Sequence, residues 1–260
     1  MDKITEHLNT VFFTAFHSKN HFINKGQDDL IRFVFCGLQK TSRISQTCLR
    51  LYPEMNEENE LEFSLGLLMR SLLMDMILVL KFKSICFEYK GNDKEELKKL
   101  VKDFCYMIIN DGTKHFIEEI FSSEKLTEEE KKEHANKFAS VFSNAFDFSN
   151  DKPKLKREFR FSLTDIYKQS NGEAFVTAET IYSLYSYYSK YEHLSHWTSV
   201  ASTHFPFEQR KGKLDTAIIL LVSHARDLLS IAYDFDENYK MLLPYMDDLQ
   251  KHLDDSYLTK

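Results

Sequence analysis

Charged side chains in two otherwise apolar helical stretches are the first candidates for chemistry. Arg70 and Asp75 stand among leucines and methionines, five positions apart and so about 140° apart around a helix. A buried charge without a partner costs several kcal/mol, so each needs a partner on another helix. We expect Arg70 to pair with Asp227, which lies beside His224 in the second stretch. These groups line either a ligand or catalytic pocket, or a buried ion pair without chemistry.

A tyrosine-rich segment at 177–202 carries the second set of candidates. Glu192 and His196 are four residues apart and can touch on one helix face. No third ligand supports a metal site, and adjacent Ser195 and His196 point about 100° apart, unlike a hydrolase pair. The segment forms either a site or an aromatic helix whose hydroxyls join neighbouring helices. The candidate pocket residues here are Tyr191, Glu192, His193, Ser195 and His196.

Two basic runs could hold phosphate groups. They lie in the irregular connection at 147–161 and in a loop expected at 205–212, marked by Pro206. Both loops could lie at one end of a helical bundle, although each could also be a solvated loop balanced by acidic neighbours. The sequence holds no Gly-rich phosphate loop. The phosphate-binding candidates are Lys154, Lys156, Arg157, Arg160, Arg210 and Lys211.

The elements that must position these groups are long helices. The chain of 260 residues has only 7 Gly and 4 Pro, which excludes the many tight turns of a sandwich, barrel or doubly wound sheet. We expect an all-α fold, a single multi-helix bundle of about nine helices over residues 1–260. A sub-division near 147–161 is possible. The segments 57–89 and 214–235 are apolar on nearly every side, which predicts two central helices.

Local signals set some of the boundaries. Thr127 followed by Glu130 matches a capping box and predicts a helix start. A helix that begins near Asp93 could be interrupted at Asp111 and Gly112. We see no strand with clean two-residue alternation.

Bulk properties narrow the class of protein. The formal net charge of −6 gives no electrostatic footprint for nucleic acid. The four cysteines lack a CxxC spacing, and we expect buried free thiols in a reducing compartment. The polar N-terminal segment is unlike a signal peptide, and Arg70 and Asp75 interrupt the most apolar stretch. We therefore expect a soluble cytoplasmic protein with no membrane span, no cofactor and no metal.

The segments LLMRSLLMD and YSKYEHLSHWTS resemble bacterial all-helical proteins of unknown function that are distantly HEPN-like. The resemblance covers Leu65–Asp75 and Gly172–Ser199. It implies a site made of Arg70, Asp75, Tyr191, Ser195 and one of His193 or His196. In the family pattern the histidine follows the serine by a few residues, whereas here His196 follows at once. The superfamily's nuclease motif, an Arg followed closely by His, is absent.

Two functions follow as expectations. The first is a cytoplasmic helical-bundle protein with a polar pocket or partner-binding surface between the helices at 57–89, 177–202 and 214–235. The alternative is a HEPN-like effector, a ribonuclease or nucleotide-modifying toxin of a bacterial defence or toxin–antitoxin system. The partners considered are a protein or a second copy of the chain, and RNA or a nucleotide.

Overall fold

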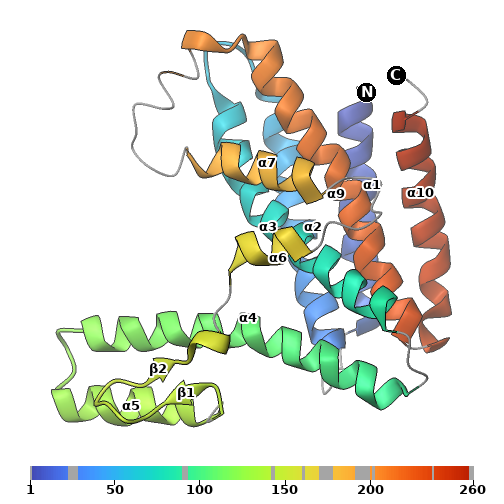
Figure 1. Cartoon of the computed structure of the whole chain (residues 1–260). Coiled ribbons are helices and arrows are strands. Elements are labelled where there is room, and N and C mark those ends of the chain that lie inside the picture. Colours follow the sequence, from blue (N-terminus) through green and yellow to red (C-terminus); the bar gives the residue numbers. More distant parts are fainter. Residues whose placement is uncertain are drawn as a thin grey trace. The chain divides into compact units, whose positions relative to one another are not determined.

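The protein is all-α and divides into two compact units, as a computed structural model shows (Figure 1). Unit 1 comprises Met1–Glu88 and Leu163–Lys260, and unit 2 comprises Tyr89–Ser162. The all-α prediction is confirmed. The unit boundary at 162 adjoins the sub-division considered at 147–161, and the boundary at 88 was not anticipated. The structure describes residues 2–22, 29–89, 93–141, 144–159, 162–169, 178–190, 200, 203–235 and 237–257.

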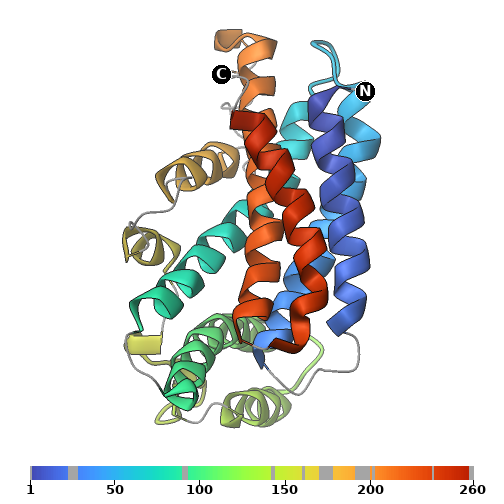
Figure 2. The ribbon, with the colours of Figure 1, turned by 90° about the vertical axis from the view of Figure 1, so that its right-hand side faces the viewer.

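Unit 1 is a bundle of long helices. Figure 2 shows α1 and α2 in blue beside α9 and α10 in orange and red, and the 3-10 turns η1, η2 and η4 lie at helix ends. Helices α6 and α7 both contact α3. The elements are α1 (Lys3–Ser18), η1 (Lys19–Phe22), α2 (Asp29–Leu51), η2 (Tyr52–Glu54), α3 (Leu61–Glu88), α6 (Leu163–Gln169), α7 (Ala178–Ser189), α9 (Phe207–Phe235), η4 (Glu237–Leu242) and α10 (Leu243–Tyr257).

Helices α3 and α9 form the centre of this bundle, as the apolar patterning predicts. Leu65, Leu72 and Ile77 of α3 are fully buried, and so are Leu221 and Leu228 of α9. Both helices are long and apolar enough to cross a membrane, with mean hydropathies of 1.9 and 1.3. More than half of each apolar window is buried inside the structure, and core helices of soluble proteins pass the same test.

Unit 2 is smaller and has a core of its own. It contains α4 (Lys94–Ser122), α5 (Glu128–Ser140), the strands β1 (Phe146–Asp147) and β2 (Lys154–Leu155), and the 3-10 turn η3 (Arg157–Phe159). The strands pair antiparallel, with Phe146 opposite Leu155. The core residues of unit 2 are Ile117, Ala135, Ala139, Ala145, Phe146 and Leu155.

Local signals in unit 2 are partly confirmed. The capping box is present, because the Glu130 amide donates to Thr127 Oγ1 at 3.3 Å and Glu130 Oε2 accepts from the Thr127 amide at 2.8 Å. Helix α4 runs without a break through Asp111 and Gly112. The strands β1 and β2 add two short extended segments where the sequence predicts only an irregular connection.

Two expectations about unit 1 are wrong. The loop expected at 205–212 is mostly helix, because α9 begins at Phe207 and the Pro206 carbonyl accepts from the Gln209 and Arg210 amides. The expectation of buried thiols holds for Cys48 and for Cys105 in unit 2. Cys36 is exposed and Cys86 is half-buried, although all four thiols are free. Cys36 shares the outward face of α2 with the exposed Arg32, four residues earlier.

Candidate functional site

Arg70 does not pair with Asp227, so that prediction is wrong. Its Nε donates to Ser189 Oγ at 3.0 Å, and its Nη2 lies 3.4 Å from the Tyr185 hydroxyl. The guanidinium also lies over the Tyr185 ring, with 5.2 Å between Cζ and the ring centroid. Arg70 therefore joins α3 to the C-terminal end of α7, because the packing of α7 on α3 brings tyrosine and serine hydroxyls to it.

The two carboxylates bind lysines instead. Asp75 Oδ2 lies 2.7 Å from Lys40 Nζ on α2, and Lys40 also donates to the Ser71 carbonyl. Burial raises the pKa of the Asp75 carboxyl, and the positive charge of Lys40 opposes that shift. Asp227 Oδ1 lies 2.5 Å from Lys83 Nζ on α3. The charged groups that we expected in one pocket thus form separate ion pairs.

His224 is buried in the middle of the bundle. It is 2 % exposed, and neither ring nitrogen has a hydrogen-bond partner. Burial, together with the positive charge of Lys40, lowers the pKa of His224 to about 3. A buried ring that makes no hydrogen bond to a described residue is a core side chain, whereas Asp227, three residues further along α9, pairs with Lys83.

The tyrosines of α7 join neighbouring helices, which was one of the two readings of this segment. The Tyr182 ring stacks on Tyr167 of α6, with 4.4 Å between the ring centroids. The Tyr188 ring is buried against Gly66 of α3. The remaining candidates Tyr191, Glu192, His193, Ser195 and His196 lie outside the described residues.

The two basic runs belong to different units. Arg210 is buried in α9, where its Nε donates to Glu62 Oε1 at 2.7 Å and its Nη1 to the Phe205 carbonyl. Lys211 Nζ donates to the Tyr52 hydroxyl at 2.6 Å and to Asp215 Oδ2 at 3.0 Å. Both cations are therefore fixed by partners within the bundle, not presented on a loop as expected.

The basic run of unit 2 is partly engaged as well. Lys156 donates to the Asn144 carbonyl at 2.8 Å, and Lys154 is exposed on β2. Arg157 is exposed in η3, while Arg160 lies outside the described residues.

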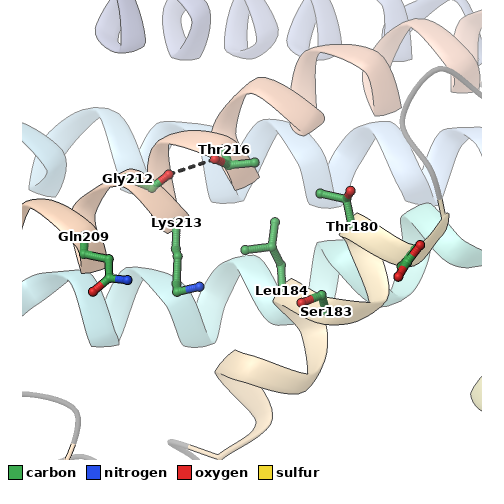
Figure 3. Close-up of a pocket in the computed structure, with 8 residues that line it drawn as sticks. Thr180, Ser183, Leu184, Gln209, Gly212, Lys213 and Thr216 are labelled. Carbon is green, nitrogen blue, oxygen red and sulfur yellow. Dashed lines mark hydrogen bonds between the residues drawn. The ribbon is translucent and has the colours of Figure 1, made fainter. Parts of the chain in front are cut away.

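An open groove lies between α7 and the first half of α9, with a volume of about 630 Å³. Residues at helical spacing on each helix line it, so that one stripe of α7 faces one stripe of α9. Figure 3 shows Gln209 and Lys213 projecting from the same side of α9, and Leu184 projecting from α7 toward that helix. The lining residues are Glu179, Thr180, Ser183 and Leu184 from α7, and Gln209, Gly212, Lys213 and Thr216 from α9.

The groove offers one cation, Lys213, and one carboxylate, Glu179, among neutral hydrogen-bonding groups. In the described part of the chain, the Lys213 ammonium lies 4.8 Å from the Tyr187 ring centroid and within ion-pair distance of no carboxylate. Thr216 Oγ1 donates to the Gly212 carbonyl at 2.8 Å, which leaves its lone pairs available. The groove residues include no histidine or cysteine, and no three metal-ligating side chains converge anywhere among the described residues. Such an arrangement can bind a polar molecule.

The sequence predicts a pocket among the helices at 57–89, 177–202 and 214–235, and the groove residues are not among its candidates. The signal that could have found them is the polar stripe at 209, 213 and 216 on α9, at the spacing of one helix face. A loop at 205–212 would not form this stripe, so the stripe is not expected where the segment is predicted to be a loop.

Comparisons with protein-family models, with curated proteins and with solved structures find no match to this chain.

Proposed function

We propose that this protein is a binding module that takes a small polar ligand with one anionic group in the groove between α7 and α9. The observation that carries this proposal is the groove itself, whose volume of about 630 Å³ falls in the range of small-molecule sites. The pocket expected between the helices at 57–89, 177–202 and 214–235 stays a prediction, since α3 gives this groove no lining residue and only Thr216 of its α9 residues lies within 214–235.

The charge of the ligand follows from Lys213. Lys40, Lys83 and Lys211 each lie within 3.0 Å of a carboxylate oxygen. Lys213 contacts the Tyr187 ring and forms no ion pair with a described residue. A lysine ammonium can form a charge-assisted hydrogen bond with a carboxylate or phosphate, so Lys213 matches an anionic group of the ligand. The Glu179 carboxylate of the same groove matches a hydrogen-bond donor or a cationic group.

The remaining lining residues determine what the rest of the ligand must offer. Ser183, Thr180 and Thr216 present hydroxyls, and Gln209 presents an amide, so the ligand needs both donors and acceptors. Leu184 supplies an apolar surface at the floor of the groove, since its side chain is 6 % exposed. The groove residues include no paired nucleophile and general base, which favours binding over catalysis.

A ligand panel tests the proposal. The full chain is titrated at millimolar concentration with amino acids, short carboxylic acids, monosaccharides, nucleoside monophosphates and a short RNA, and binding is followed by the amide and methyl NMR shifts of the groove residues. We expect a singly anionic small molecule to perturb them. RNA binding without small-molecule binding would instead favour the effector hypothesis.

Three variants locate the site. Ser183→Phe fills the groove and should abolish binding. Lys213→Met keeps the aliphatic stem and should lower the affinity for an anionic ligand by about tenfold or more. Lys251→Met removes an exposed charge of α10 and serves as the matched control. If no ligand class perturbs the groove, or if Ser183→Phe binds as the wild type does, the proposal is wrong.

A further inference from the structure

A pair of histidines, His7 buried and His252 half-buried, joins the first and last described helices of unit 1. His7 of α1 is 1 % exposed, and its Nδ1 lies 3.2 Å from Nδ1 of His252 of α10. The two rings meet edge to face, with 5.3 Å between their centroids. His252 Nε2 in turn lies 2.8 Å from the Thr10 hydroxyl. The pair therefore lies at the contact between two helices that are distant in sequence.

This contact requires particular protonation states. A hydrogen bond between two Nδ1 atoms needs one ring to donate and the other to accept. If both rings take up a proton, both Nδ1 atoms carry hydrogens that point at each other, and two positive charges lie about 5 Å apart. The Thr10 hydroxyl can adapt to either role of His252 Nε2, so it does not relieve this conflict. Full protonation of the pair and close contact of α1 with α10 thus exclude each other.

The surroundings of the pair also disfavour protonation of His7. Burial lowers the pKa of His7, and the nearby His252 and Lys3 lower it further, while the carboxylates Glu6 and Asp255 oppose the shift. Lys3, Glu6 and His7 lie on α1, and His252 and Asp255 lie on α10. The charged groups that act on His7 therefore come from the two helices that the pair joins. A ring with a lowered pKa takes up its proton more readily once it is exposed.

We propose that protonation of the His7–His252 pair in mildly acidic solution releases α10 from the bundle while the central helices stay folded. Leu249 and Leu253, which are buried on α10, would then become accessible, together with the faces of α1 and α9 that they cover. The device is independent of the groove between α7 and α9, since α10 contributes no lining residue to it.

Hydrogen exchange of the full chain tests the proposal, measured by mass spectrometry at about pH 7.5 and about pH 5.5, on either side of the ordinary histidine pKa. After correction for the intrinsic exchange rate, we expect protection of α10 amides to fall about tenfold or more, with α3 and α9 unchanged. In the double variant His7→Gln/His252→Gln the side chains can still hydrogen-bond but do not titrate, so this loss should disappear. His17→Gln, on the exposed side of α1, should behave as the wild type.

Histidine ring NMR of the wild type gives a second readout that needs no variant. The His7 ring should take up its proton in the same pH range in which the α10 amides lose protection. The proposal is overturned if both rings titrate while α10 stays protected, or if α10 and α3 lose protection together. It is also overturned if the double variant folds and keeps the acid-induced loss.

Discussion

The two units of this protein bury their helices in different ways. In unit 1, α3 is apolar all round and is covered by α2, α6, α7 and α9. In unit 2, α4 and α5 cover a core of six residues, half of them alanines. The aromatic side chains Phe116 and Phe138 of these helices meet at 4.6 Å but stay 42 % and 43 % exposed. A helix that is apolar on every side requires several neighbours, whereas amphipathic helices can form a unit with few.

The same contrast holds for the charged groups. Unit 1 buries Glu62 and Arg210 as a pair with side-chain exposures of 2 % and 5 %. Among the described residues of unit 2, ion pairs such as Lys98–Glu95 are largely exposed. Changes that remove one charge should therefore destabilise unit 1 strongly and unit 2 hardly at all, since exposed pairs contribute little.

Glu62→Ala should have the largest effect, because it leaves the Arg210 guanidinium buried without its carboxylate. Loss of one partner of a buried ion pair typically costs about 3–5 kcal/mol in free energy of unfolding. We expect a loss of that size for unit 1, measured by urea unfolding of the full chain at neutral pH. Glu95→Ala, which removes an exposed pair of unit 2, is the matched control and should change stability by less than about 1 kcal/mol.

The double variant Glu62→Leu/Arg210→Met sharpens this test. It replaces both charges by apolar side chains, so most of the lost stability should return. If Glu62→Ala and Glu95→Ala destabilise the protein equally, the electrostatic contrast between the units is wrong.

Acid should destabilise unit 1 through His224. Its folded-state pKa of about 3 lies below the ordinary value of 6.5, so the unfolded chain takes up a proton that the folded ring excludes. The stability is thus complete above about pH 6.5 and decreases by about 1.4 kcal/mol per pH unit as the pH falls toward 3. His224→Leu should remove this slope, which urea unfolding between about pH 7 and pH 4 measures as the difference between the two proteins.

The contrast also predicts where acid acts. The side chain of His115 in unit 2 is 64 % exposed, so His115→Gln is the exposed control and should leave the slope unchanged. Because the lowered pKa of His7 gives both proteins a slope of its own, the His224 contribution is the difference between them, and equal slopes in the two proteins would contradict it.

The sequence predicts where the helices lie better than it predicts which side chains meet between them. The all-α class, the central positions of α3 and α9 and the Thr127–Glu130 cap follow from composition and local periodicity, which depend on residues close in the chain. The partner of Arg70 could not be predicted in this way, because it depends on how α7, more than a hundred residues away, packs on α3. Pro206 was interpreted as the mark of a loop, although it stands directly before a helix start.

The candidate site shows the same limit. The groove residues between α7 and α9 could not be predicted, since the facing stripes depend on the register of two helices. His224 is a pocket candidate in the sequence, yet the bundle buries it without a hydrogen-bond partner among the described residues.

Two glycines inside long helices test the packing contrast directly. A Cβ added at Gly66 of α3 would lie 2.1 Å from Cε1 of buried Tyr188, whereas one added at Gly112 of α4 meets nothing within 4 Å. Overpacking of a well-packed interface costs about 1–3 kcal/mol, and an open helical Gly→Ala change gains about 0.5–1 kcal/mol. Gly66→Ala should therefore destabilise unit 1, and Gly112→Ala should stabilise unit 2, as urea unfolding with probes in each unit can measure.

The Gly66→Ala variant also connects packing with function. Because Tyr188 lies on α7 between Leu184 of the groove and Ser189, which binds Arg70, its displacement should shift α7 and weaken ligand binding in the groove. Gly112→Ala belongs to unit 2 and should leave that binding unchanged. Equal effects of the two substitutions on stability would contradict the tight fit of α7 on α3. Unchanged binding in a destabilised Gly66→Ala protein would show that the groove does not depend on this contact.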